Sequence, residues 1–242
     1  MPEPRARDVL GLTSRGFHRI RYWEWGDPAN PRVLVCVHGL TRNGRDFDNL
    51  AAAFMDRYRV LCPDVVGRGD SDWIDSGDYT YPQYCADMVN LIARSGATEI
   101  DWVGTSMGGL IGMILAAQAK APIRRMVLND VGPFIPKAAL DAIAENVADN
   151  PEFASVEAAA GYIAEVNAGF GRLARAQWLA LATSTVRRRD DGKFVWKRDP
   201  AIGKGFVTQP RNDLALWPVW DMVRCPVLVL RGAESALLPA AV

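Results

Sequence analysis

Apolar and polar residues follow two different spacings along the first half of the chain. Continuous apolar, β-branched runs such as VLVCV at residues 33–37 are typical of strands covered on both faces. The stretch at 81–95 has helical spacing instead, with Pro82 in its first turn and Gly96 just beyond its end. FHRIRYWEW at 17–25 alternates as a half-buried strand does, and further strands are predicted at the runs that contain Val33, Val60, Ile100, Met126 and Val227. The alternation predicts an α/β fold with a doubly wound, mostly parallel sheet.

The pattern changes at Pro133. Helical spacing then continues through KAALDAIAENVADN, VEAAAGYIAEVNAGF and ARAQWLALATSTV, without a strand between them, and a loop, RRRDDGKFVWKRDP, follows. We interpret this segment as a helical cap over the carboxyl edge of the sheet. The predicted division is residues 1–132 for the first part of the core, 133–206 for the cap and 207–242 for the second part of the core.

Composition limits the classes of partner. The chain has 242 residues, 28 basic and 28 acidic, so it presents no net field for a polyanion such as nucleic acid. No apolar run reaches the roughly 18 residues of a membrane span. The four cysteines are widely spaced, which favours reduced structural thiols over a disulfide or metal site. These features predict a cytoplasmic protein that needs no metal or cofactor and binds neither nucleic acid nor membrane.

One serine carries the strongest chemical signal. Gly104-Thr105-Ser106-Met107-Gly108 matches G-x-S-x-G between a predicted strand and a predicted helix. Glycine on either side permits a turn that lifts the hydroxyl of Ser106 clear of the sheet. The N–H of Met107, at the start of the helix, would then face a developing oxyanion. The alternative is an ordinary glycine-rich turn.

The second candidate motif is VHGL at residues 37–40. Gly39 would let the loop bend so that the N–H of Leu40 supplies a second oxyanion donor. His38 is the tempting general base, but it precedes the serine. The α/β-hydrolase fold, which these two motifs resemble, orders its triad serine, acid, histidine. His18, on the first predicted strand, is expected to be a surface or half-buried residue without a catalytic role.

Taken together, the chain resembles the α/β-hydrolase superfamily, in particular its soluble bacterial esterase-like members with a helical cap. The resemblance covers residues 32–235 and rests on VHGLTRNGRDF, CPDVVGRGDSD, WVGTSMGGLIG, LNDVGP and CPVLVLRGAES. It implies hydrolysis of a small-molecule ester through a serine acyl-enzyme. It also implies that Asp72 braces the loop after the fourth strand without reacting.

The chain departs from that pattern near its end. Relatives usually carry the catalytic aspartate in the loop after VLVLRG, where this chain has Ala236. Their histidine lies beyond the point that corresponds to Val242. We therefore expect a core without its last strand, helix and catalytic histidine, and little activity. The strand at Val227 is expected to be an exposed apolar sheet edge.

Three acids could orient a histidine. Asp130, at the end of the strand after the serine helix, is the candidate catalytic acid, and a loop-bracing role is its alternative. Glu234 would reach only if its loop shifted, and Asp64 is expected to be structural. The arginines at 187–189 could attract an anionic substrate, although such a run is usually a solvated loop. The aromatic residues of the cap are expected to form its core, and these are Phe153, Tyr162, Phe170, Trp178 and Trp196.

Two rival functions remain. The first is a non-catalytic module that binds a small molecule on the same fold. The second is a carbon–carbon bond hydrolase or a cofactor-free haloperoxidase on the same serine scaffold. Haloalkane dehalogenase and epoxide hydrolase chemistry is disfavoured, since it needs a carboxylate where Ser106 stands. The sequence leaves the acyl group, the leaving group and the oligomeric state open.

Overall fold

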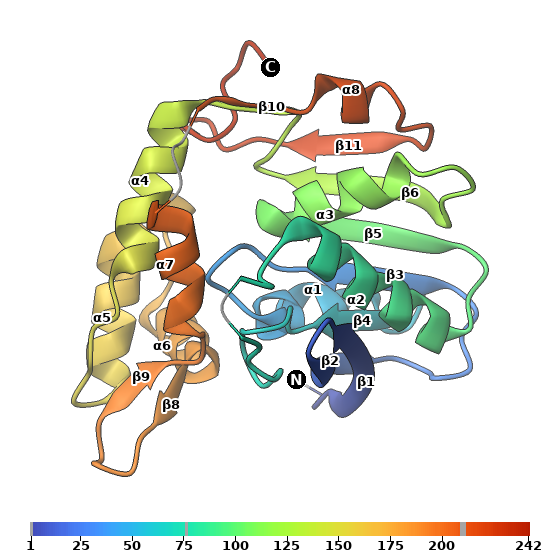
Figure 1. The fold of residues 1–242 in the computed structure, drawn as a ribbon. Coiled ribbons are helices and arrows are strands. Elements are labelled where there is room, and N and C mark those ends of the chain that lie inside the picture. The colour runs from blue at the N-terminus through green and yellow to red at the C-terminus, as the bar shows by residue number, and fades with distance from the viewer. Residues whose placement is uncertain (1, 76, 209–211) are drawn as a thin grey trace.

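The computed structural model describes residues 2–75, 77–208 and 212–242, and a central sheet in the order β1-β2-β4-β3-β5-β6-β11 dominates it (Figure 1). The strands from β4 to β11 in that order pair in parallel, whereas β1 and β2 form an antiparallel hairpin that joins β4 antiparallel. The strands are β1 (Arg5–Thr13), β2 (Gly16–Trp25), β3 (Val33–Val37), β4 (Arg59–Pro63), β5 (Ile100–Thr105), β6 (Ile123–Asn129) and β11 (Val227–Leu230). The predicted doubly wound, mostly parallel sheet is confirmed.

Helices cover both faces of this sheet. They are η1 (Gly44–Phe47), α1 (Asp48–Phe54), α2 (Tyr81–Ser95) and α3 (Met107–Ala116). Alternate residues of β3 belong to two separate cores: Val35 packs in the core with α2 and α3, and Cys36 packs in the core with η1 and α1. This two-sided burial explains why β3 is a continuous apolar run.

Helix α2 has the ends that the sequence predicts. The hydroxyl of Thr80 accepts a hydrogen bond from the N–H of Gln83, and Pro82 lies in the first turn. Gly96 ends the helix with a φ of 72°, a conformation that glycine adopts without strain.

Residues 137–208 form a separate group of helices beside the sheet, at the arrowhead end of β11 (Figure 1). Its helices are α4 (Lys137–Ala148), α5 (Val156–Val166), η2 (Ala168–Phe170), α6 (Arg175–Thr185) and α7 (Pro200–Thr208). No described residue between 138 and 185 belongs to the main sheet. We call this group the cap; its exact limits, 133 and 206, stay a prediction.

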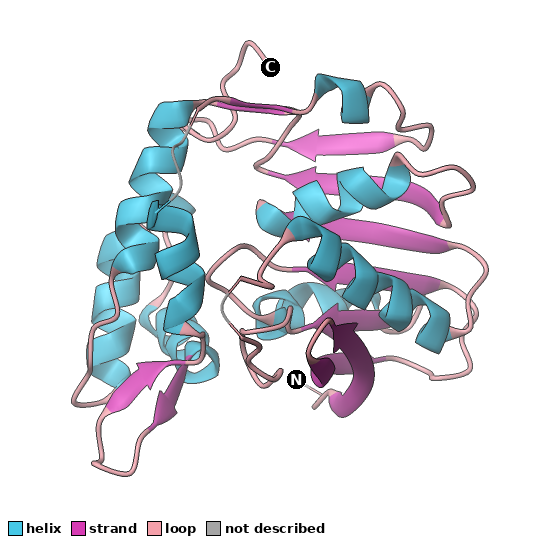
Figure 2. Ribbon diagram, viewed as in Figure 1, coloured by secondary structure: helices cyan, strands magenta, loops and turns pink. Residues whose placement is uncertain are grey.

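The cap contains one element that the sequence analysis misses. The segment expected to be a loop holds an antiparallel hairpin of β8 (Val186–Arg188) and β9 (Phe194–Trp196) (Figure 2). The hairpin forms because Trp196 and Phe153 pack edge to face, with ring centroids 4.9 Å apart, and because Phe153 pairs with Phe194 through the backbone. Tyr162 and Trp178 pack against the same cluster, as expected, whereas the side chain of Phe170 lies outside the described residues.

The chain returns to the core through short elements. These are β7 (Phe134–Ile135), β10 (Leu214–Ala215) and α8 (Trp217–Trp220), and β7 pairs with β10. Strand β11 then pairs with β6 at the end of the sheet, where Leu228 is 56% exposed and Leu230 is 47% exposed. The expected exposed apolar edge is therefore present.

Two further features of the fold bear on the predictions. Strand β1 is missing from the sequence analysis because most of its residues are exposed, so no buried face produces an alternating pattern. None of the helices in the described part of the chain has both the length and the apolar character needed to cross a membrane.

Candidate functional site

Ser106 lies at a strained turn between β5 and α3. Its φ is 49° and its ψ is −113°, a combination that a residue with a side chain rarely adopts. The flanking glycines are required by close packing. A Cβ on Gly104 would lie 2.4 Å from the carbonyl oxygen of Gly108, and a Cβ on Gly108 would lie 2.0 Å from that of Val37. The turn therefore has the geometry that the sequence motif predicts.

The loop after β3 lies against this turn. A Cβ on Gly39 would come within 3.7 Å of the Cβ of Ser106, so the backbone at residue 39 borders the serine. The N–H of Leu40, the next residue, makes no backbone hydrogen bond within the described residues. Met107 begins α3, and the first N–H groups of a helix have no partner within it. Two candidate oxyanion donors are thus next to Ser106 in the chain or in space.

His38 is fully buried, and both of its ring nitrogens are engaged. Its Nε2 accepts a hydrogen bond from the N–H of Val65 at 2.9 Å, which leaves Nδ1 to donate to the carbonyl of Gly39 at 2.7 Å. Burial lowers the pKa of His38 to about 4, and the positive charge of Arg68 contributes to that decrease. The imidazole is held neutral as a brace for the loop, and neither nitrogen is available to Ser106.

His18 is more deeply buried than the sequence analysis expects. Only 5% of it is exposed, and its Nε2 lies 3.0 Å from a carboxylate oxygen of Asp87 on α2. This corrects the expectation of a surface or half-buried residue: the hairpin β1–β2 packs on α2 and covers the ring. Because His18 and His38 are the two histidines of the chain, no imidazole in these 242 residues is positioned on Ser106.

Asp130 follows β6 and holds the loop after β11. Its carboxylate accepts hydrogen bonds from the N–H of Gly232 and from the hydroxyl of Ser235, both at 2.9 Å. Its own φ is 55°, so this residue also sits at a strained backbone position. These contacts fit the loop-bracing alternative, and the loop that Asp130 fixes contains the exposed residues Glu234 and Ala236.

Asp64 and Asp72 both have structural partners. Asp64 accepts hydrogen bonds from the N–H groups of Gly44 and Asp70, so it joins two loops at the carboxyl edge of the sheet. Burial raises the pKa of Asp64 to about 6, although these N–H donors oppose the increase. Asp72 accepts a hydrogen bond from the N–H of Arg19 at 2.7 Å and braces its loop, as the resemblance implies.

The sequence analysis misses Arg68, a fully buried arginine beside the serine turn. Its guanidinium donates to the carbonyl of Leu40 at 3.0 Å and lies 3.6 Å from the sulfur of Met107. It also donates to the hydroxyl of Tyr84 at 3.0 Å. The arginine thus contacts both residues of the candidate oxyanion site. An arginine between two glycines gives no sequence signal of burial, since the same pattern is typical of a solvated loop.

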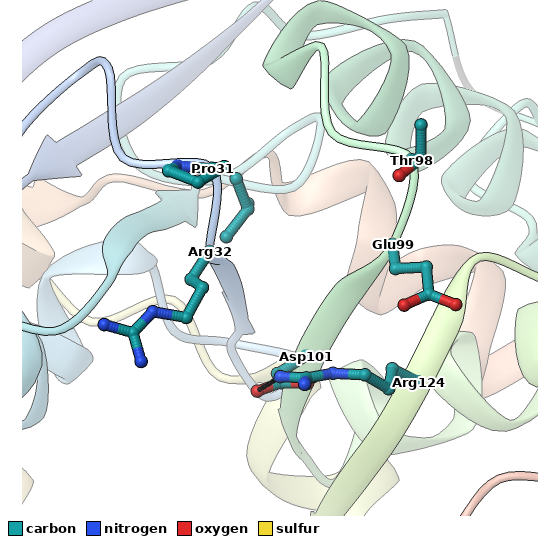
Figure 3. Close-up of a pocket in the computed structure, with 7 residues that line it drawn as sticks. Pro31, Arg32, Thr98, Glu99, Asp101 and Arg124 are labelled. Carbon is teal, nitrogen blue, oxygen red and sulfur yellow. Dashed lines mark hydrogen bonds and ion pairs between the residues drawn. The ribbon is translucent and has the colours of Figure 1, made fainter.

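A cavity of about 170 Å³ lies where β3 and β5 begin, at the opposite end of these strands from Ser106 (Figure 3). Its lining residues are Pro31, Arg32, Val33, Thr98, Glu99, Asp101 and Arg124. Arg124 lies against Asp101 and donates to both carboxylate oxygens, at 3.0 and 2.9 Å (Figure 3). Although burial raises the pKa of Asp101, hydrogen bonds from Arg124 and Tyr58 outweigh it and keep the pKa low. This carboxylate is a structural ion-pair centre far along β5 from Ser106.

Comparison with known proteins gives a consistent result. The family profile described as the alpha/beta hydrolase fold matches residues 32–240. The chain is 45% identical to the 3-hydroxybutyrate-oligomer hydrolase of Cupriavidus necator, over 97% of this chain and 83% of that protein. It is 29% identical to an esterase of Mycobacterium tuberculosis, over 88% of this chain and 70% of that protein. Among solved structures, an α/β hydrolase from Novosphingobium aromaticivorans aligns with a TM-score of 0.86 at 35% identity, over 100% of this chain and 85% of that one.

Proposed function

Because this chain belongs to the α/β-hydrolase fold family, we propose that it is a serine hydrolase that cleaves carboxylic esters through an acyl-enzyme on Ser106. The observation that carries the proposal is the strained turn at Ser106, packed against the loop at Gly39. The similarity to a 3-hydroxybutyrate-oligomer hydrolase supports esters of short hydroxyacids as the substrate class.

In this proposal Ser106 attacks the acyl carbon of the ester, and its hydroxyl proton passes to a base. The carbonyl oxygen becomes an oxyanion that accepts hydrogen bonds from the N–H groups of Leu40 and Met107. The C–O bond to the alcohol then breaks, and the alcohol leaves with a proton. Water attacks the acyl-enzyme by the same route and releases the carboxylic acid.

The identity of the base sets the expected rate. Both histidines of the chain are engaged elsewhere, so the serine lacks an imidazole to take its proton. Loss of the base from a triad costs on the order of 10⁶ in turnover and leaves about 10³ to 10⁴ over water. We propose that the 242-residue chain hydrolyses activated esters slowly. Asp130 is the candidate acid that would orient a histidine placed beside Ser106.

The experiment is hydrolysis of p-nitrophenyl esters of graded acyl length by the purified chain and by Ser106→Ala. Slow turnover that disappears in Ser106→Ala supports the serine mechanism. Fast turnover that survives in Ser106→Ala refutes it. Fast turnover that requires Ser106 overturns only the expectation of a missing base, and His38→Gln then tests the nearest imidazole.

A second function is favoured by the same engagement of both histidines: a module that binds a small ester or acid without cleaving it. Its signature is saturable binding of the ester with equal, background hydrolysis by the chain and by Ser106→Ala. The ester panel therefore separates the two functions.

A further inference from the structure

The core and the cap meet along two extended segments next to the proposed site. The N–H of Gly69 donates to the carbonyl of Lys197 at 2.7 Å, and the N–H of Asp199 donates to the carbonyl of Gly67 at 2.8 Å. An antiparallel bridge between Arg68 and Arg198 lies between these two bonds. We call this contact the seam. It fixes residues 67–69 of the core against residues 197–199 of the cap.

A cavity of about 240 Å³ lies beside the seam. Gly69 and Trp73 line it from the core, and Arg187 and Lys197 line it from the cap. The guanidinium of Arg187 lies over the ring of Trp73, 5.7 Å from the ring centroid. Trp73 is 45% exposed, so a broad apolar face and two cations border the same space. This combination suits a ligand with an anionic end and an apolar chain.

The charges at the rim of this cavity do not cancel. Lys197 pairs with Asp70 at 2.8 Å, and that pair is nearly neutral. Arg187 has no carboxylate partner within the described part of the chain and is exposed beside the cavity. The open rim thus presents one unpaired guanidinium.

Two buried guanidiniums behind the cavity strengthen the positive field. Arg68 is 0% exposed and Arg198 is 7% exposed, and in the described structure both are bonded to groups other than carboxylates. The carboxylate of Asp199, the residue after Arg198, instead accepts a hydrogen bond from the hydroxyl of Tyr79 at 2.7 Å. The carboxylate of Asp149 offsets part of the charge of Arg198. No carboxylate bonds either guanidinium within the described residues, so both raise the local potential and favour an anionic ligand.

The same residues connect the cavity to the serine. Gly69 lines the cavity, and its neighbour Arg68 reaches the carbonyl of Leu40 and the sulfur of Met107. On the other side, the amide of Asn43 donates to the carbonyl of Ser184 at 3.0 Å, so the loop after β3 also touches the cap near β8. The side chain of Arg68 therefore links the segment that lines the cavity to both candidate oxyanion residues beside Ser106.

We propose that the cavity lined by Gly69, Trp73, Arg187 and Lys197 binds the free carboxylate of the substrate. The inference rests on the proposed ester hydrolysis, and it names the substrate class: esters that carry a carboxylate at one end, as linear hydroxyacid oligomers do. Arg187 pairs with the carboxylate, and the face of Trp73 packs on the adjoining chain.

Binding to the Ser106→Ala chain tests this without turnover. The probes are the linear dimer of 3-hydroxybutyrate, which has a free carboxylate, and its methyl ester, which has none, both measured by isothermal titration calorimetry. We expect the dimer to bind about tenfold more tightly than the methyl ester in low salt, because a charge-assisted pair contributes that much. In 0.5 M NaCl the difference should shrink, since Arg187 is exposed.

The variants locate the effect. Arg187→Gln should weaken binding of the dimer to the level of the methyl ester and leave the methyl ester unaffected. Arg57→Gln is the matched control, because Arg57 also lies over an aromatic ring, that of Phe54 at 5.9 Å. Arg57 precedes β4, whereas residues 67–69 of the seam follow the other end of that strand. Equal affinity for the two probes, or a preference that survives in Arg187→Gln combined with Lys197→Gln, overturns the carboxylate site. If the p-nitrophenyl esters show no hydrolysis that depends on Ser106, but the dimer still binds more tightly than its methyl ester, then only the proposed hydrolysis is refuted.

Discussion

Substitution of Ser106 by glycine should stabilise the protein. The φ of 49° and ψ of −113° at this residue lie in a region that costs a residue with a Cβ about 1–3 kcal/mol. Glycine adopts it without that strain, but its greater freedom in the unfolded chain offsets about 0.5–1 kcal/mol. The net gain should be about 1 kcal/mol, and for a chain of this size that is roughly 2–4 °C in Tm.

The matched comparison is Ser106→Ala, which removes the hydroxyl and keeps the Cβ. Thermal and urea unfolding of both variants should place Ser106→Gly about 1 kcal/mol above Ser106→Ala, and Ser106→Ala close to the parent chain. The comparison separates backbone strain from loss of the side chain. A glycine variant no more stable than the alanine variant would show that the turn stores no strain, and the strained-nucleophile geometry would be wrong.

Three other perturbations have defined outcomes. Gly108→Ala should lower the free energy of unfolding by about 1–3 kcal/mol or more, because its methyl group would meet the carbonyl of Val37 at 2.0 Å; unchanged urea unfolding would contradict the packing. Burial lowers the pKa of His38 to about 4, so the unfolded chain, with a pKa near 6.5, takes up the proton first and stability is lost as pH falls through that window. The stability advantage of the parent over His38→Gln should therefore shrink by about 2 kcal/mol between pH 7 and pH 5, whereas a constant gap would mean that the imidazole is not held neutral. Asp130→Asn should increase proteolytic cleavage in the loop at residues 232–235, which the carboxylate now holds; equal cleavage in parent and variant would argue against the bracing role.

Much of the serine turn follows from local sequence. Gly104 and Gly108 are needed because neighbouring backbone atoms approach too closely for any Cβ, and that steric demand appears directly as a glycine pattern. The parallel strands are equally readable, since burial on both faces requires a continuous apolar run such as that of β3. The ends of α2 follow from Pro82 and Gly96 in the same way.

The chemistry around the turn depends on contacts between distant segments. His38 is neutral because the fold buries it, and its Nε2 accepts a hydrogen bond from the N–H of Val65, 27 positions away. No local pattern at VHGL reveals that burial or that partner. The hairpin β8–β9 is not predicted from the sequence, because its own residues resemble a charged loop. Aromatic packing with other parts of the cap stabilises it.

Arg68 shows most clearly the difference between what local sequence reveals and what distant contacts decide. The sequence presents an arginine between two glycines, a pattern typical of an exposed turn, whereas the folded chain buries it completely. Its burial is possible because the carbonyls of Leu40 and Val66 and the hydroxyl of Tyr84 come from separate segments and together replace water around the guanidinium. Steric demands at a turn and the burial of apolar strands depend on neighbouring residues, so they leave a pattern in the sequence. Hydrogen bonding and charge compensation in a buried site act across the fold, so only the tertiary structure decides them.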